Sequence, residues 1–219
     1  MALAVGGGVL LVVLSFIAVS LALQALEIDS SLGTFALAQV VAYAGQAWIA
    51  WYVLFRRRGA APHQVGFKWV GPGPILLMIP ALVGLIFVNI PVGILSSMLF
   101  DEVTTPREQL LGEGDSFPLA SFIPLFFVVV VVAPIVEEFI FRGMFFRLLR
   151  SHRSFWAAAF ISALVFSITH FIPSLVLFLF VLGLVLAWVV ERYESLYPAM
   201  ALHAFNNAFA VIVLYVALN

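Results

Sequence analysis

The sequence of 219 residues contains no cysteine. This absence removes disulfides, thiolate nucleophiles and thiolate metal ligands from every hypothesis about the protein. Charged residues are also scarce, at 10% of the chain, and the formal net charge is −1. Because the chain carries neither a basic arm nor an acidic tail, its charge gives no indication of a nucleic-acid partner.

Apolar residues dominate the chain instead. They make up 64% of the sequence, and the mean hydropathy is +1.18. Soluble globular domains contain only about 45–50% apolar residues, because the core of a domain of about 219 residues cannot bury a larger fraction. The composition therefore indicates an integral membrane protein.

Several apolar segments have the length of about 20 residues that a membrane-spanning helix needs. They predict an all-α, polytopic transmembrane bundle of about seven spans, with six to eight as the limits. The first segment lacks a basic start and its apolar run is too long for a signal peptide, so we expect a retained span. The third contains Pro72, Pro74, Pro80 and Pro91, which predict a bend or a break. The segments are 3–26, 35–55, 74–100, 120–149, 155–170, 174–190 and 197–217.

Seven crossings would separate the loop charges by sign. Most basic residues, including Arg56, Arg150 and Arg192, would fall on one side, whereas the acidic stretch "DEVTTPREQLLGEGDSFP" would fall on the other. Basic loops stay in the cytoplasm, so we expect the acidic loop and the C-terminus outside. No linker or fixed-period repeat divides the chain, which predicts a single membrane domain over 1–219.

The stretch "VVAPIVEEFIFRGMFF" places Glu137 and Glu138 side by side within an apolar segment. A charge at bilayer depth costs at least ~2.5 kcal/mol on insertion scales and usually marks function. The alternative is that the pair ends a helix at the membrane interface. Arg142 follows Glu138 by four residues and shares its helix face, so the two can form an ion pair. Glu137 points roughly 100° away and stays available for chemistry.

Two histidines accompany the acids in apolar segments. His170 follows Phe166 by four residues in "FSITHFIPS", and His203 precedes Asn207 by four in "ALHAFNNAF". A single membrane histidine is as often a packing residue as a functional one. If both helices are straight, the two histidines lie at different depths in the membrane. At the helical rise per residue, His170 is ~24 Å from the cytoplasmic edge and His203 is ~8 Å from it.

A carboxylate and an imidazole can share a water molecule and activate it for attack on a carbonyl. A second imidazole and a carboxamide can donate hydrogen bonds to the resulting oxyanion. This set therefore favours peptide-bond hydrolysis without a covalent nucleophile. Serine catalysis is less favoured, because Ser167 near His170 lies in no G-x-S-x-G elbow.

Three motifs occur in order in successive membrane segments. "EEFIFR" matches EExxxR, "FSITH" matches FxxxH and "HAFNN" matches HxxxN. Together they resemble the CPBP (Abi) family of intramembrane proteases, which includes the type II CAAX prenyl proteases. The resemblance covers roughly 124–216 and so most of the predicted motif-bearing core, approximately 120–217.

The resemblance implies a role for each matching residue. Glu137 would be the water-activating base working with His170, while Glu138 and Arg142, with Phe166, would support the geometry of the site. His203 and Asn207 would form the oxyanion hole. The family also implies a site that opens toward the cytoplasm.

Metal dependence stays open in this resemblance. His170, His203 and Glu137 could supply three zinc ligands, with water as the fourth. However, EExxxR lacks the paired histidines of H-E-x-x-H. A glutamate-driven mechanism with no obligatory cofactor is therefore favoured over zinc.

Two other functions remain as alternatives to the protease. One is a catalytically silent membrane immunity or scaffold protein of the same fold, and the other is a proton-coupled transporter, which would also use buried acids. For the protease, the partner would be a peptide or protein substrate in the bilayer, membrane-associated or prenylated. The sequence does not specify that substrate. The expected location is a prokaryotic plasma membrane.

Overall fold

A computed structural model describes Leu14 and residues 32–100 and 118–219. The described part is helical and has no strand, which confirms the predicted all-α bundle. The predicted span 3–26, apart from Leu14, and nearly all of the acidic loop lie outside the described residues. The α-helices are α2 (Leu32–Trp51), α3 (Pro72–Leu76), α4 (Met78–Leu99), α6 (Leu119–Phe127), α7 (Ala133–Glu138), α8 (Arg147–Arg150), α9 (Phe155–Ile168), α10 (Val176–Tyr193) and α11 (Leu196–Leu218). The π-helical segments are η1 (Tyr52–Arg57), η3 (Val128–Val132) and η4 (Phe139–Phe146), and the 3₁₀ turns are η2 (Pro62–Val65) and η5 (Pro173–Leu175).

Within the described residues, four helices are long and apolar enough to cross a membrane: Pro72–Leu99, Phe122–Arg150, Pro173–Tyr193 and Leu196–Ala217. The apolar helix α9 is shorter, with 14 residues, or ~21 Å against a hydrocarbon core of about 30 Å. The count of about seven spans therefore stays a prediction. The proline-rich third segment is interrupted at Leu77, between α3 and α4, whereas α4 continues through Pro80 and Pro91.

One long helix, from α6 through α8, occupies the centre of the bundle and is the most buried of the four. Its hydrogen bonding changes from α-helical to π-helical at two places, η3 and η4. In η3 the cause is Pro134, which has no N–H to donate, while the N–H of Ala133 bonds to the carbonyl of Val128 five residues back. Wide turns of this kind are frequent at functional sites. Here they lie on both sides of Glu137 and Glu138, the last residues of α7.

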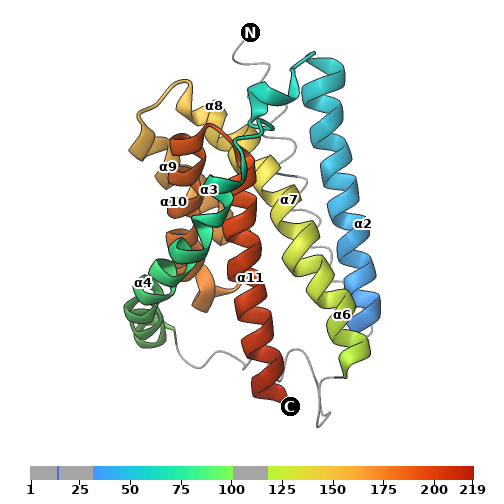
Figure 1. Cartoon of the computed structure of the whole chain (residues 1–219), viewed down its shortest axis with the longest axis vertical. Coiled ribbons are helices and arrows are strands. Elements are labelled where there is room, and N and C mark those ends of the chain that lie inside the picture. Colours follow the sequence, from blue (N-terminus) through green and yellow to red (C-terminus); the bar gives the residue numbers. More distant parts are fainter. Residues whose placement is uncertain (1–13, 15–31, 101–117) are drawn as a thin grey trace.

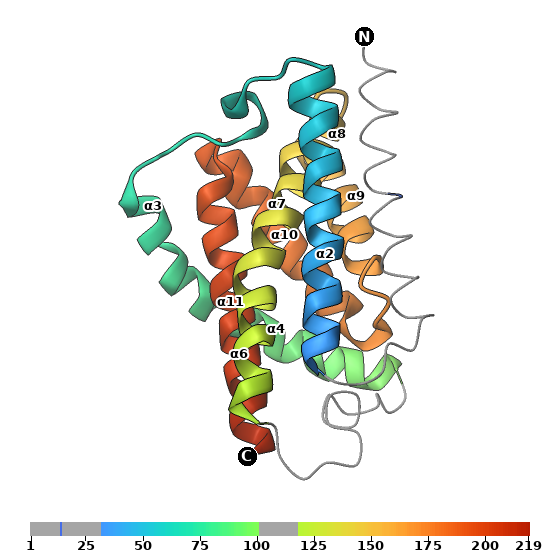
Figure 2. The same ribbon diagram turned by 90° about the vertical axis from the view of Figure 1, so that its right-hand side faces the viewer.

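The other helices pack around this central helix. α2 runs along one side of α6 and α7, and α4 crosses α11 and α10 on the other side (Figures 1 and 2). Among the described elements, α9 and α10 share the most extensive contact. Small residues allow it, because a Cβ on Gly183 would lie 2.8 Å from the Cβ of Ala163. Helices in membranes often associate through such small residues.

Basic residues collect at one end of the bundle, as the loop charges predicted. Arg57 lies in the last turn of η1, Arg147 and Arg150 lie in α8, and Arg192 lies in the last turn of α10. Figure 1 shows the end of α2, α8 and the start of α11 at this end, opposite the C-terminus. The distribution fits a membrane protein with one basic face.

Candidate active site

Glu138 forms the structural half of the acid pair. Its Oε1 accepts a hydrogen bond from Nη1 of Arg142 at 2.9 Å, and both side chains are fully buried. Arg142 also donates to the carbonyl of Gly183 at 3.1 Å, and its guanidinium lies 4.3 Å from the ring centroid of Phe166. The predicted ion pair is thus present, and it compensates a charge that would be costly to bury alone.

Glu137 contacts a different set of side chains. Its Oε1 accepts a 2.5 Å hydrogen bond from the hydroxyl of Tyr43 in α2. Its Oε2 lies 4.0 Å from Nε2 of His170 and 3.8 Å from Nε2 of His203. The side chain is only 4% exposed, so the interface alternative for the acid pair does not fit this arrangement.

His170 lies just beyond α9, in a turn where Phe171 has a φ of 55°. Its Nδ1 is 2.8 Å from the carbonyl of Phe166. Because a carbonyl only accepts hydrogen bonds, we assign the proton to Nδ1, which makes Nε2 of the neutral ring an acceptor facing Glu137. The side chain is 25% exposed, which makes it the least buried member of the cluster.

His203 joins the two acids. Its Nδ1 lies 3.0 Å from Oε1 of Glu138, while its Nε2 faces Glu137. The straight-helix depths that separated His170 from His203 were wrong, since both imidazoles reach the same oxygen. The estimate had assumed straight, untilted helices that all start at the same depth.

Asn207 lies one turn beyond His203 on α11, and its Nδ2 donates to the carbonyl of Val129 at 2.9 Å. In the π-helical register, the carbonyl of Val129 would accept a hydrogen bond from the backbone N–H of residue 134. Residue 134 is a proline and has no N–H, so the side chain of Asn207 supplies the donor instead. Asn206 donates in turn to Oδ1 of Asn207. An amide nitrogen has two N–H groups, so one bond to Val129 still leaves the other for a substrate.

The structure thus brings six predicted residues into one cluster, and Asn207 lies one helical turn from it. The cluster consists of Glu137, Glu138, Arg142, Phe166, His170 and His203. Sequence reasoning missed Tyr43. A signal was present, since Tyr43 and Gln46 are two polar side chains on one face of an apolar helix. Neither residue belongs to one of the three motifs.

The donor set has the atom types of a zinc site, but its geometry does not fit one. Bonds of about 2.0–2.2 Å place two tetrahedral ligands about 3.4 Å apart, whereas both imidazoles lie farther than this from Glu137. Over residues 32–100 and 118–219, no three His, Asp or Glu side chains form a metal-binding group.

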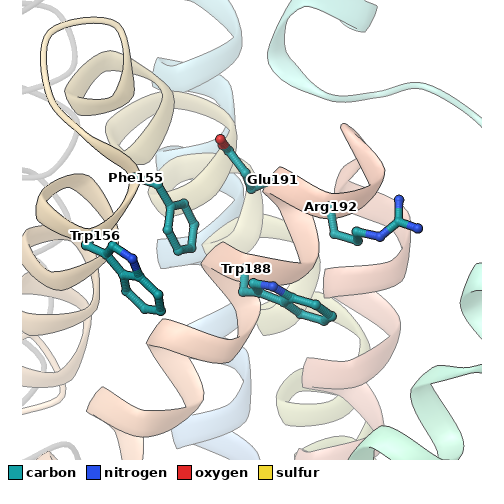
Figure 3. A pocket seen from close by; sticks show the side chains of 5 residues that line it. All are labelled: Phe155, Trp156, Trp188, Glu191 and Arg192. Atoms are coloured by element: carbon teal, nitrogen blue, oxygen red, sulfur yellow. The ribbon is translucent and has the colours of Figure 1, made fainter.

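A surface hollow of about 440 Å³ lies elsewhere, between α9 and α10 (Figure 3). Phe155 and Trp156 line it from α9, and Trp188, Glu191 and Arg192 line it from α10. Glu191 also accepts a hydrogen bond from Arg150 at 2.9 Å. None of the predicted site residues lines this hollow.

The part of the chain that carries the cluster is similar to known proteins. Residues 119–209 match the family model of the type II CAAX prenyl endopeptidase Rce1-like proteins. These residues are Rce1-like. The Rce1-like segment contains all seven predicted site residues, whereas Tyr43 and the whole of α2 precede it. The suspected family is thereby confirmed at the level of this segment.

A relative with a curated description is similar over a segment of nearly the same length. The putative membrane peptidase YdiL of Bacillus subtilis is 32% identical over 92 residues, which cover 42% of this chain and 38% of that protein. The chain therefore matches well under half of its relative. No solved structure matches the chain.

Proposed function

We propose that the protein is an intramembrane endopeptidase that hydrolyses a peptide bond with water activated by Glu137 and His170. One observation supports this most directly. Oε2 of Glu137 lies 4.0 Å from Nε2 of His170, inside an apolar bundle, with the opposite carboxylate oxygen already bonded to Tyr43. This separation is too long for a direct hydrogen bond and suits one shared water molecule.

The two acceptors can then divide the water between them. One O–H would point at Oε2 of Glu137 and the other at Nε2 of His170. As the water oxygen attacks the carbonyl carbon, Glu137 takes its proton. When the tetrahedral intermediate collapses and the C–N bond breaks, the same proton passes to the leaving amine.

His203 and Asn207 would stabilise the oxyanion. Glu138 holds Nδ1 of His203, so a protonated His203 presents Nε2–H toward the reacting group. Asn207 would contribute the N–H that is not bonded to Val129. In this scheme Glu138 and Arg142 touch no substrate and instead fix the orientation of His203.

The remaining expectations are also proposals. The reaction needs no obligatory metal, and the substrate is a peptide or protein at the membrane, with prenylated CAAX peptides as the first probe. The Rce1-like family supports this substrate class. The location is a prokaryotic plasma membrane, with the site open to the cytoplasm on the basic side of the bundle.

A glutamate-to-glutamine exchange tests the proposal. We expect Glu137→Gln to lower kcat about 10²- to 10⁴-fold, because general-base catalysis contributes that much. Cleavage of a prenylated CAAX peptide and of a peptide library by purified protein measures it.

The matched control is Glu191→Gln, which alters a half-exposed ion pair with Arg150 and should keep native activity. Equal cleavage by native protein and Glu137→Gln would reject the base. If the native protein cleaves no peptide at all, the silent scaffold or the transporter becomes the better interpretation.

A further inference from the structure

The hydroxyl of Tyr43 lies 2.5 Å from Oε1 of Glu137, a shorter distance than in the other hydrogen bonds described for the cluster. An O–H group that bonds to a carboxylate typically lies 2.5–2.7 Å from it, and such a bond is about twice as strong as a neutral one. Tyr43 belongs to α2, outside the Rce1-like segment, and 94 positions separate the two residues in sequence. The base therefore depends on a helix that the motifs do not include.

This bond gives the two oxygens of Glu137 different surroundings. Oε1 is held by the phenol, while Oε2 faces the two imidazoles. The last torsion of a glutamate is broad and roughly two-fold, so a carboxylate without such a partner turns freely. The hydroxyl restricts this rotation and keeps Oε2 directed at His170.

The helix that carries Tyr43 is well placed to hold it. α2 packs along α6, η3 and α7, the stretch that ends at Glu138 (Figure 2). Ala50, two turns beyond Tyr43, is fully buried. The phenol therefore approaches Glu137 from a helix that is packed against the helix of the acid pair.

We propose that Tyr43 is a positioning residue of the hydrolytic site, acting through Glu137 and supplied by α2. The inference rests on the proposed function. It predicts that loss of the hydroxyl impairs the chemical step and leaves substrate binding intact, since Tyr43 acts on the base and not on the peptide.

The test is Tyr43→Phe, which removes one oxygen and keeps the ring. Losing one charge-assisted hydrogen bond should lower kcat about 10- to 100-fold, with KM unchanged. The matched control is Tyr52→Phe, which removes a hydroxyl from an exposed ring stacked on Trp48, at the start of η1 directly after α2. It should keep native kcat and KM. Thermal unfolding in detergent verifies that each variant is folded.

Three results would overturn the inference: a native kcat in Tyr43→Phe, a change confined to KM, or an equal loss of kcat in Tyr52→Phe. Comparison with Glu137→Gln separates this failure from failure of the proposed function. If Glu137→Gln is inactive while Tyr43→Phe is native, only the role of Tyr43 is wrong. If Glu137→Gln is fully active, the proposed function itself is wrong.

Discussion

At the residue scale, two adjacent glutamates have different neighbours, and this difference is the basis for proposing different roles for them. Glu138 contacts a guanidinium and an imidazole and is fully buried. Glu137 contacts a phenol and faces two imidazoles from a distance that suits water. The helical turn of about 100° between neighbours sends one side chain toward Arg142 and the other toward α2. One acid can therefore hold the site together while the other performs chemistry.

Metal removal tests this distribution of roles. A sample treated with a chelator and dialysed should keep full activity on the peptide that the untreated protein cleaves, because in the proposed mechanism Glu137 and His170 would activate water without an ion. Metal analysis of the same sample serves as the control. Recovery of a lost activity only after zinc is added would contradict the expectation and restore Glu137, His170 and His203 as ligands.

At the element scale, the contact of α9 with α10 sets the position of the buried arginine. Gly183 lets the helices approach, and its carbonyl accepts a hydrogen bond from Arg142 at 3.1 Å. A Cβ at this position would lie 2.8 Å from the Cβ and 2.9 Å from the Cα of Ala163. Since neither atom belongs to a flexible side chain, any added methyl group must push the helices apart.

Gly183→Ala should therefore destabilise the protein by about 1–3 kcal/mol, as overpacking usually does, and lower activity as Arg142 shifts. Thermal unfolding in detergent measures the change. Ala163→Gly in the same background should restore stability. Gly84→Ala, on a helical glycine with no atom within 4 Å of the added Cβ, should have no effect. An equal loss in both single variants would contradict the packing argument.

At the scale of the whole molecule, the ends of the bundle differ in charge. Arginines lie in the last turns of η1, α8 and α10, at one end of the bundle. The C-terminus lies at the opposite end. Basic segments stay in the cytoplasm, so the proposed site would receive substrate from that compartment.

The absence of cysteine makes this orientation testable by labelling. In cells, an impermeant maleimide should modify Asn219→Cys from outside and Arg153→Cys only after the membrane is permeabilised. Both positions are exposed. The untouched chain, which has no thiol, is the control. The reverse pattern would place the basic end outside and contradict the orientation.

Much of the fold followed from the sequence because hydropathy and helix spacing are local properties. The predicted segments 174–190 and 197–217 correspond closely to α10 and α11. The spacing of Glu138 and Arg142 gave their ion pair directly, since residues four apart share a helix face. Depth failed for His170 and His203, because tilt and starting plane depend on neighbouring helices.

The sequence by itself determined a helical membrane protein with costly polar side chains in three of its segments, and the i, i+4 relations within each. Only the tertiary structure decided that these segments share one cluster and that Tyr43 completes it. The reason is physical. Contacts within a helix are set by a fixed rise and turn per residue, whereas contacts between helices depend on how the side chains of many residues pack.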